Sequence, residues 1–169
     1  MQTVPSLTRI AELPPPRPGN RPHLRRGVPH IQADQLPEGG AMEALIQACA
    51  SIPHIRSKQS RMASAEATAL YLPDRFAVGP LEAFIDGHEF CHLNPDAAIH
   101  LTLPLLVRNE VVRLGWGEEH PITKLGILPA LLTVYAPRER SEIIPIWKLV
   151  VLSCRFAMGE LTMLNHKPA

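Results

Sequence analysis

The chain has 169 residues, 46% of them hydrophobic, and its 17 basic and 16 acidic side chains give a formal net charge of +1. This length fits one domain, and the near-zero charge gives no general electrostatic basis for binding nucleic acid or an anionic membrane. The cysteines Cys49, Cys91 and Cys154 form no CxxC pair and no closed disulfide set, as is typical of the reducing cytosol. Without a basic, apolar leader or a run of ~18 apolar residues, we expect a cytoplasmic protein with no nucleic-acid or membrane partner.

Proline dominates the start of the chain. Eight of the 18 prolines and five arginines lie in the first forty residues. Because proline has no backbone N–H and a fixed φ, this stretch favours neither a long helix nor a central strand, and its composition is typical of a disordered or polyproline tail. We therefore divide the chain into a proline- and arginine-rich extended arm, residues 1–40, and a globular domain, residues 41–169.

The first half of the domain alternates between helix and strand signals. Apolar residues at helical spacing predict a short helix over residues 41–51. The second half of residues 60–72 is predicted as a strand. Residues 81–94 fit either a helix or a strand, whereas residues 98–103 alternate in the manner of a strand. With the turn signal at Pro95 between them, these last two segments predict a β-hairpin.

The second half adds two longer helices. Residues 104–115 predict a helix that starts at a proline and ends at a glycine, and a loop follows up to Gly126. Residues 131–135 read as a buried strand, and a final helix starts at Ser141 and Glu142. This order predicts an α+β fold with a small, mostly antiparallel sheet packed against two or three helices.

Residues 88–92 match the H-E-x-x-H motif of zinc hydrolases. On a helix, the motif places His88 and His92 one turn apart, with Glu89 as the base beside the metal-bound water. In a strand, Glu89 would point away from both histidines. Gly87 and Pro95 leave little room for a helix, so a chance match is favoured, and a zinc-dependent hydrolase stays as an alternative.

Three histidines are candidates for a shared site. Facing strands of the hairpin bring His92 and His100 within ~5 Å at Cβ, and His120 follows in a glycine-containing loop. Three histidines can bind a metal ion with open positions, or one of them can act as a general base near neutral pH. The alternative is that each is an ordinary hydrogen-bonded histidine of a sheet or loop.

Two further side chains have a functional and a structural interpretation. Trp116 lies between Gly115 and Gly117, where it can cap the core or stack on a planar substrate. Arg138 follows a predicted strand, where it can hold an anion or be simply solvated.

Several segments together carry a family pattern: EFCHL at 89–93, IHLTLP at 99–104, GWGEEHP at 115–121 and VYAPR at 134–138. This succession resembles the luciferase-like domain family, which includes the fungal luciferase and many bacterial members of unknown role. The similarity extends to residues 57–72 and 151–157. It also includes the arginine-proline stretch at residues 17–22, so we expect the arm to be partly ordered and to wrap the domain in extended form.

The resemblance implies a function. The fungal luciferase oxygenates a hydroxylated pyrone with O₂ and is not known to require a flavin or nicotinamide. By resemblance, we expect an oxidoreductase that acts on an enol, pyrone or phenol by oxygenation or proton transfer, with O₂ as co-substrate and no required cofactor. The catalytic candidates are His92, His100 and His120, which are also the candidate ligands of a divalent metal. The substrate-binding candidates are Asn94, Trp116, Glu118, Tyr135 and Arg138.

The chain also departs from the family pattern. Many relatives carry a second histidine two positions after the first, where this chain has Asn94, a weak ligand and no base. The fungal enzyme has an N-terminal membrane anchor, for which this sequence shows no signal. A non-catalytic small-molecule-binding module is therefore a further alternative, and the sequence does not fix the oligomeric state.

Overall fold

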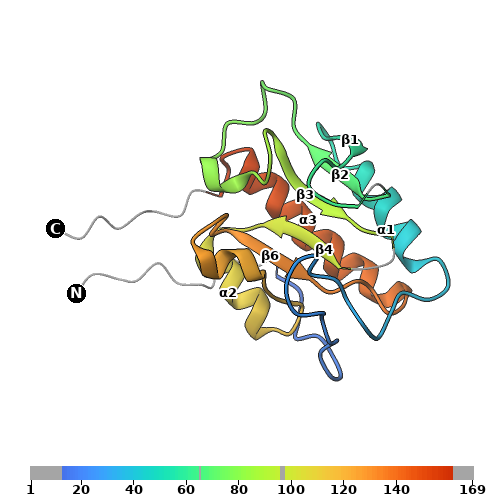
Figure 1. Cartoon of the computed structure of the whole chain (residues 1–169). Coiled ribbons are helices and arrows are strands. Elements are labelled where there is room, and N and C mark those ends of the chain that lie inside the picture. Colours follow the sequence, from blue (N-terminus) through green and yellow to red (C-terminus); the bar gives the residue numbers. More distant parts are fainter. Residues whose placement is uncertain (1–12, 65, 96–97, 162–169) are drawn as a thin grey trace, which may run out of the picture.

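Six short strands pair antiparallel into one open sheet, with three α-helices, in the computed structural model, which describes residues 13–64, 66–95 and 98–161 (Figure 1). The strand order is β1-β2-β3-β4-β6-β5, and the predicted α+β class is confirmed. The strands are β1 (Arg56–Gln59), β2 (Thr68–Tyr71), β3 (Glu89–Leu93), β4 (Ile99–Thr102), β5 (Gly117–Glu119) and β6 (Leu131–Val134). The helices are α1 (Ala41–Ala50), α2 (Leu105–Arg113), α3 (Ile143–Ala157) and the short 3₁₀ helices η2 (Leu81–Ala83), η3 (Pro121–Leu125) and η4 (Arg140–Glu142).

One face of the sheet forms the hydrophobic core with α1 and α3. Side chains paired directly across antiparallel strands point to the same side, and one such row consists of Leu70, Cys91, Leu101 and Leu132. All four are fully buried and belong to one cluster with apolar residues of α1 and α3. None of the helices in the described part of the chain is long and apolar enough to cross a membrane.

The other face carries a polar row one residue out of step with the apolar one. In this row His92 pairs with His100, His100 with Thr133, and Thr133 with Glu118. The predicted hairpin and its facing histidines are thus confirmed. Residues 13–40, blue in Figure 1, cross β4 and β6 on this side and cover the row.

A β-bulge in β3 changes the direction of Glu89. Leu70 of β2 pairs with Cys91, but the next residue, Tyr71, pairs with Glu89, so Phe90 is an extra residue without an opposite partner. A bulge of this kind shifts the alternation of side chains by one position. Glu89 therefore lies on the same side as His92, and the expectation that a strand would point it away from His92 was wrong.

Other differences from the sequence-based elements concern short segments. The β1 strand was not predicted because all four of its residues are exposed and polar, so no apolar alternation marks it. The predicted loop at residues 115–126 contains β5 and η3. Residues 81–94, which fitted either state, begin with η2 and end with β3.

The described part of the arm, residues 13–40, has no helix or regular strand but is tied to the domain by a buried arginine. The Arg17 guanidinium donates to both carboxylate oxygens of Glu142, at 3.1 and 2.8 Å, and lies over the rings of Trp116 and Tyr135. Residue Pro15 accepts a hydrogen bond from the Trp116 indole at 2.7 Å. Residues 1–12 of the predicted arm lie outside the described residues.

Glu142 joins the arm to the end of β6. Its carboxylate also accepts from the backbone N–H and the guanidinium of Arg138. Burial alone would raise the pKa of Glu142, but the hydrogen bonds from Arg17 and Arg138 outweigh burial and lower that pKa to about 2. The carboxylate is therefore charged at neutral pH and is the anchor for the arm.

Replacing Arg17 tests this anchor. Arg17→Ala leaves part of the buried Glu142 charge uncompensated, and we expect a loss of about 3 kcal/mol in the free energy of unfolding, measured by urea denaturation. Arg26→Ala, an exposed arginine of the same arm, is the matched control and should change stability by less than about 0.5 kcal/mol. Equal effects of the two substitutions would contradict the anchoring role.

Candidate functional site

Four histidines meet on the covered face of the sheet. His92 comes from β3, His100 from β4, His120 from the turn after β5, and His30 from the arm. Each is at most 7% exposed. The ring centroids of His100 lie 4.8 Å from those of both His92 and His120, and His30 lies 5.2 Å from His120. The structure thus brings the three predicted histidines together and adds His30, which the sequence did not indicate.

Two of these histidines belong to a buried hydrogen-bonded chain, here called the inner chain. Ser60 Oγ donates to Glu89 Oε1 at 3.1 Å, and the same oxygen lies 2.8 Å from His92 Nδ1. His92 Nε2 lies 2.8 Å from His100 Nδ1. His100 Nε2 then donates to the backbone carbonyl of His30 at 3.0 Å. The inner chain therefore connects a buried carboxylate to the arm through two imidazoles.

A second chain, the outer chain, connects the ring of His30 to a partly exposed carboxylate. Thr133 Oγ1 lies 2.7 Å from His30 Nδ1, and His30 Nε2 lies 3.1 Å from Glu118 Oε1. The Tyr135 hydroxyl donates to the other oxygen of Glu118 at 3.1 Å. Burial, followed by the Glu118 charge, raises the pKa of Tyr135 to about 12, so this hydroxyl keeps its proton at neutral pH.

His120 contacts both His30 and His100 in the cluster. Its Nδ1 accepts a hydrogen bond from the backbone N–H of Ile122 at 3.3 Å, and its Nε2 has no hydrogen-bond partner among the described residues. Burial, reinforced by the neighbouring imidazoles of His30 and His92, lowers the pKa of His120 to about 4. Burial likewise lowers the pKa of His100 well below its usual range. Both rings are therefore neutral near pH 7.

The cluster can be compared with the predicted metal site. Nitrogen atoms of His30, His100 and His120 lie within 4.8 Å of one another, a spacing at which three histidines can share an ion. However, both nitrogens of His30, His92 and His100 are already hydrogen-bonded. An ion would have to displace some of these bonds, so we assign no metal ligands, and the metal role of His92, His100 and His120 stays a prediction.

The other predicted site residues divide into two groups. Glu118 and Tyr135 belong to the outer chain and so lie beside the histidines. The remaining three have their hydrogen bonds elsewhere. Trp116 bonds to the arm, Arg138 bonds to Glu142 and the carbonyl of Pro18, and Asn94 donates to the Ala98 carbonyl across the hairpin turn.

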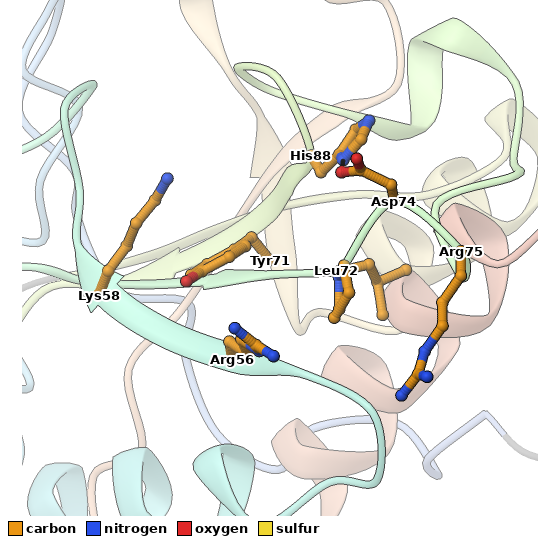
Figure 2. A pocket seen from close by; sticks show the side chains of 8 residues that line it. Arg56, Lys58, Tyr71, Leu72, Asp74, Arg75 and His88 are labelled. Atoms are coloured by element: carbon orange, nitrogen blue, oxygen red, sulfur yellow. Dashed lines mark ion pairs between the residues drawn. The ribbon is translucent and has the colours of Figure 1, made fainter.

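The histidines of the H-E-x-x-H motif do not share a site. The motif starts in the turn before β3, at His88, and continues in that strand rather than in a helix. His88 lies 3.3 Å from the carboxylate of Asp74 and lines an open surface pocket of about 600 Å³ with Arg56 and Lys58 (Figure 2). His92 is buried in the inner chain instead, so the spacing required by the zinc hydrolase is absent.

One family model matches the part of the chain that contains three of the four clustered histidines. The model of the Luciferase domain matches residues 87–153, which run from just before β3 into α3 and include His92, His100 and His120. This match is consistent with a luciferase-like domain and supports a luciferase-like function at the level of the family. Neither the curated proteins nor the solved structures yield a match.

The neutral histidines predict how stability depends on pH. The unfolded chain binds a proton at His120 near pH 6.5, but the folded chain does so only near pH 4. Stability should therefore fall as the pH is lowered through this interval, by roughly 2–3 kcal/mol from His120 alone, in urea denaturation at a series of pH values.

Two variants isolate this contribution. His120→Asn removes one titrating ring and should make the dependence in this interval shallower, by the contribution of His120, while that of His100 remains. His88→Asn, at the surface pocket, should leave it as in the wild type. A His120→Asn variant with an unchanged pH dependence would show that His120 is not held neutral by the fold.

Proposed function

We propose that the histidine cluster transfers a proton to or from a planar, oxygen-rich small molecule, an enol, pyrone or phenol, and so prepares it for oxidation by O₂. The observation that carries this proposal is the inner chain, a buried path of hydrogen bonds from Glu89 to Nε2 of His100. The Luciferase domain match over the same residues supports it.

The carbonyl of His30 indicates where a substrate oxygen would bind. The carbonyl oxygen lies 3.0 Å from His100 Nε2, which is a normal hydrogen-bond distance. A substrate oxygen could form the same hydrogen bond at this position. In this proposal the substrate hydroxyl replaces that carbonyl when the His30 segment moves aside. His120 Nε2, which carries the proton because Nδ1 accepts from Ile122, donates to a second substrate oxygen.

The proton movement balances along the inner chain. When His100 Nδ1–H donates to His92 and His92 Nδ1–H donates to Glu89, His100 Nε2 has a free lone pair. The substrate hydroxyl gives its proton to this lone pair, and the Nδ1 proton of His100 passes to His92 Nε2. His92 then holds a positive charge beside the Glu89 carboxylate. The substrate is left as an electron-rich anion, which loses electrons to O₂ in the following step.

A second candidate function is supported by the same burial. All four histidines are at most 7% exposed, as expected if the cluster only fastens the arm to the sheet of a non-catalytic binding module. In that case, hydrogen bonds such as that between His100 and His30 are structural. Turnover separates the two candidates.

Oxygen uptake provides the test. We expect the wild type to increase O₂ consumption with at least one hydroxypyrone or catechol, and His100→Gln to reduce that rate at least about a hundredfold, because a positioned proton acceptor typically contributes this much. His88→Gln is the matched control and should keep the wild-type rate.

Folding of each variant is checked by circular dichroism. If His100→Gln is folded and as fast as the wild type, the proton-transfer role is excluded. If none of these substrates increases O₂ consumption in the wild type, the binding module is the better description.

A further inference from the structure

The inner chain has acceptors at both ends. At one end is the carboxylate of Glu89 and at the other the backbone carbonyl of His30. Three hydrogen bonds lie between them, and each needs one proton on a ring nitrogen or on the carboxyl group. Two neutral imidazoles carry only one N–H each. The inner chain therefore holds one proton more than neutral His92 and His100 supply.

The place of this extra proton follows from the bonds. His100 Nε2 must be an N–H because its partner is a carbonyl, so His100 Nδ1 accepts from His92 Nε2–H. The extra proton thus lies between His92 Nδ1 and Glu89. Ser60 Oγ donates to this carboxyl group at 3.1 Å, and a donated hydrogen bond stabilises the charged form of a carboxylate.

We propose that Glu89 and His92 store this proton as a buried ion pair, and that Glu89 is a positioning residue that keeps His100 with its Nε2–H directed at the ligand site. The catalytic use of the stored proton rests on the function proposed above, in which this same state, with a charged His92 and an Nε2–H on His100, is reached after the substrate has given up its proton. The inner chain then passes one proton to solvent before His100 Nε2 accepts the next one. The proton count itself does not rest on that function. The site loaded in this way presents N–H groups of His100 and His120 and binds an oxyanion, such as an enolate or phenolate.

The groups around His92 agree with a charge at this place. Glu89 faces it from the same strand and His100 from β4, and His120 contacts His100, with 4.8 Å between the ring centroids. Burial first, and then the positive charge of His92, lowers the pKa of His100. A positive charge on His92 and a neutral His100 are therefore compatible within the inner chain.

Histidine ring ¹⁵N NMR of the full chain near pH 7 tests the proposal without any substrate. In the wild type we expect both ring nitrogens of His92 to be protonated, and His100 to be protonated at Nε2 only. A singly protonated His92 in the wild type would overturn the proposal. This measurement stands even if a variant fails to fold.

Glu89→Gln gives the sharper comparison. Its amide N–H can donate to His92 Nδ1, so the three hydrogen bonds persist with two neutral imidazoles, and His92 should lose one proton signal. Glu118→Gln makes the same change in the outer chain and should leave His92 doubly protonated. Persistence of a doubly protonated His92 in folded Glu89→Gln would overturn the role of Glu89.

Kinetics then separates this inference from the proposed function. With an active substrate, Glu89→Gln should lower kcat about tenfold or more with little change in KM, whereas a structural role would leave kcat unchanged. A wild type with a doubly protonated His92 but no oxygen uptake would overturn the proposed function and leave the stored proton standing.

Discussion

Burying a polar face of a sheet requires a partner for every donor and acceptor on it, since an unpaired buried polar group costs about 1–3 kcal/mol. In this protein the requirement applies to the row of His92, His100, Thr133 and Glu118. The arm covers this row, so water cannot be its hydrogen-bond partner. The backbone carbonyl and the imidazole of His30 take that place. The inner and outer chains both include one of these hydrogen bonds to His30.

The same requirement explains why the arm has a fixed path without secondary structure. Its proline-rich backbone has few donors to satisfy, and its fixed φ values reduce the entropy lost on ordering. The guanidinium of Arg17 supplies a further attachment, to Glu142. An extended, donor-poor segment is thus a suitable cover for a sheet face whose own polar groups need only a few well-placed partners.

Pattern and spacing predicted much of this architecture from particular residues. The helices and the hairpin follow from apolar periodicity and from the turn at Pro95, and the hairpin register alone placed His92 opposite His100. The bulge at Phe90 could not be predicted, because nothing in a five-residue strand marks which residue will lack a partner. His30 was not predicted because the composition of its segment is typical of a tail. Its hydrogen-bond partners His100, Glu118 and Thr133 are 70, 88 and 103 residues away in the sequence, so no local pattern connects them.

His30 lies outside the part of the chain that the family model matches, although it belongs to the histidine cluster. Sequence similarity to the Luciferase domain covers residues 87–153, which hold three of the four clustered histidines. The fourth, together with the carbonyl that closes the inner chain, comes from outside that range. A change confined to the segment around His30 would therefore alter the hydrogen bonds of the cluster without any substitution in the matched region. The residues that the family model matches and the residues that form the cluster are not the same set in this chain.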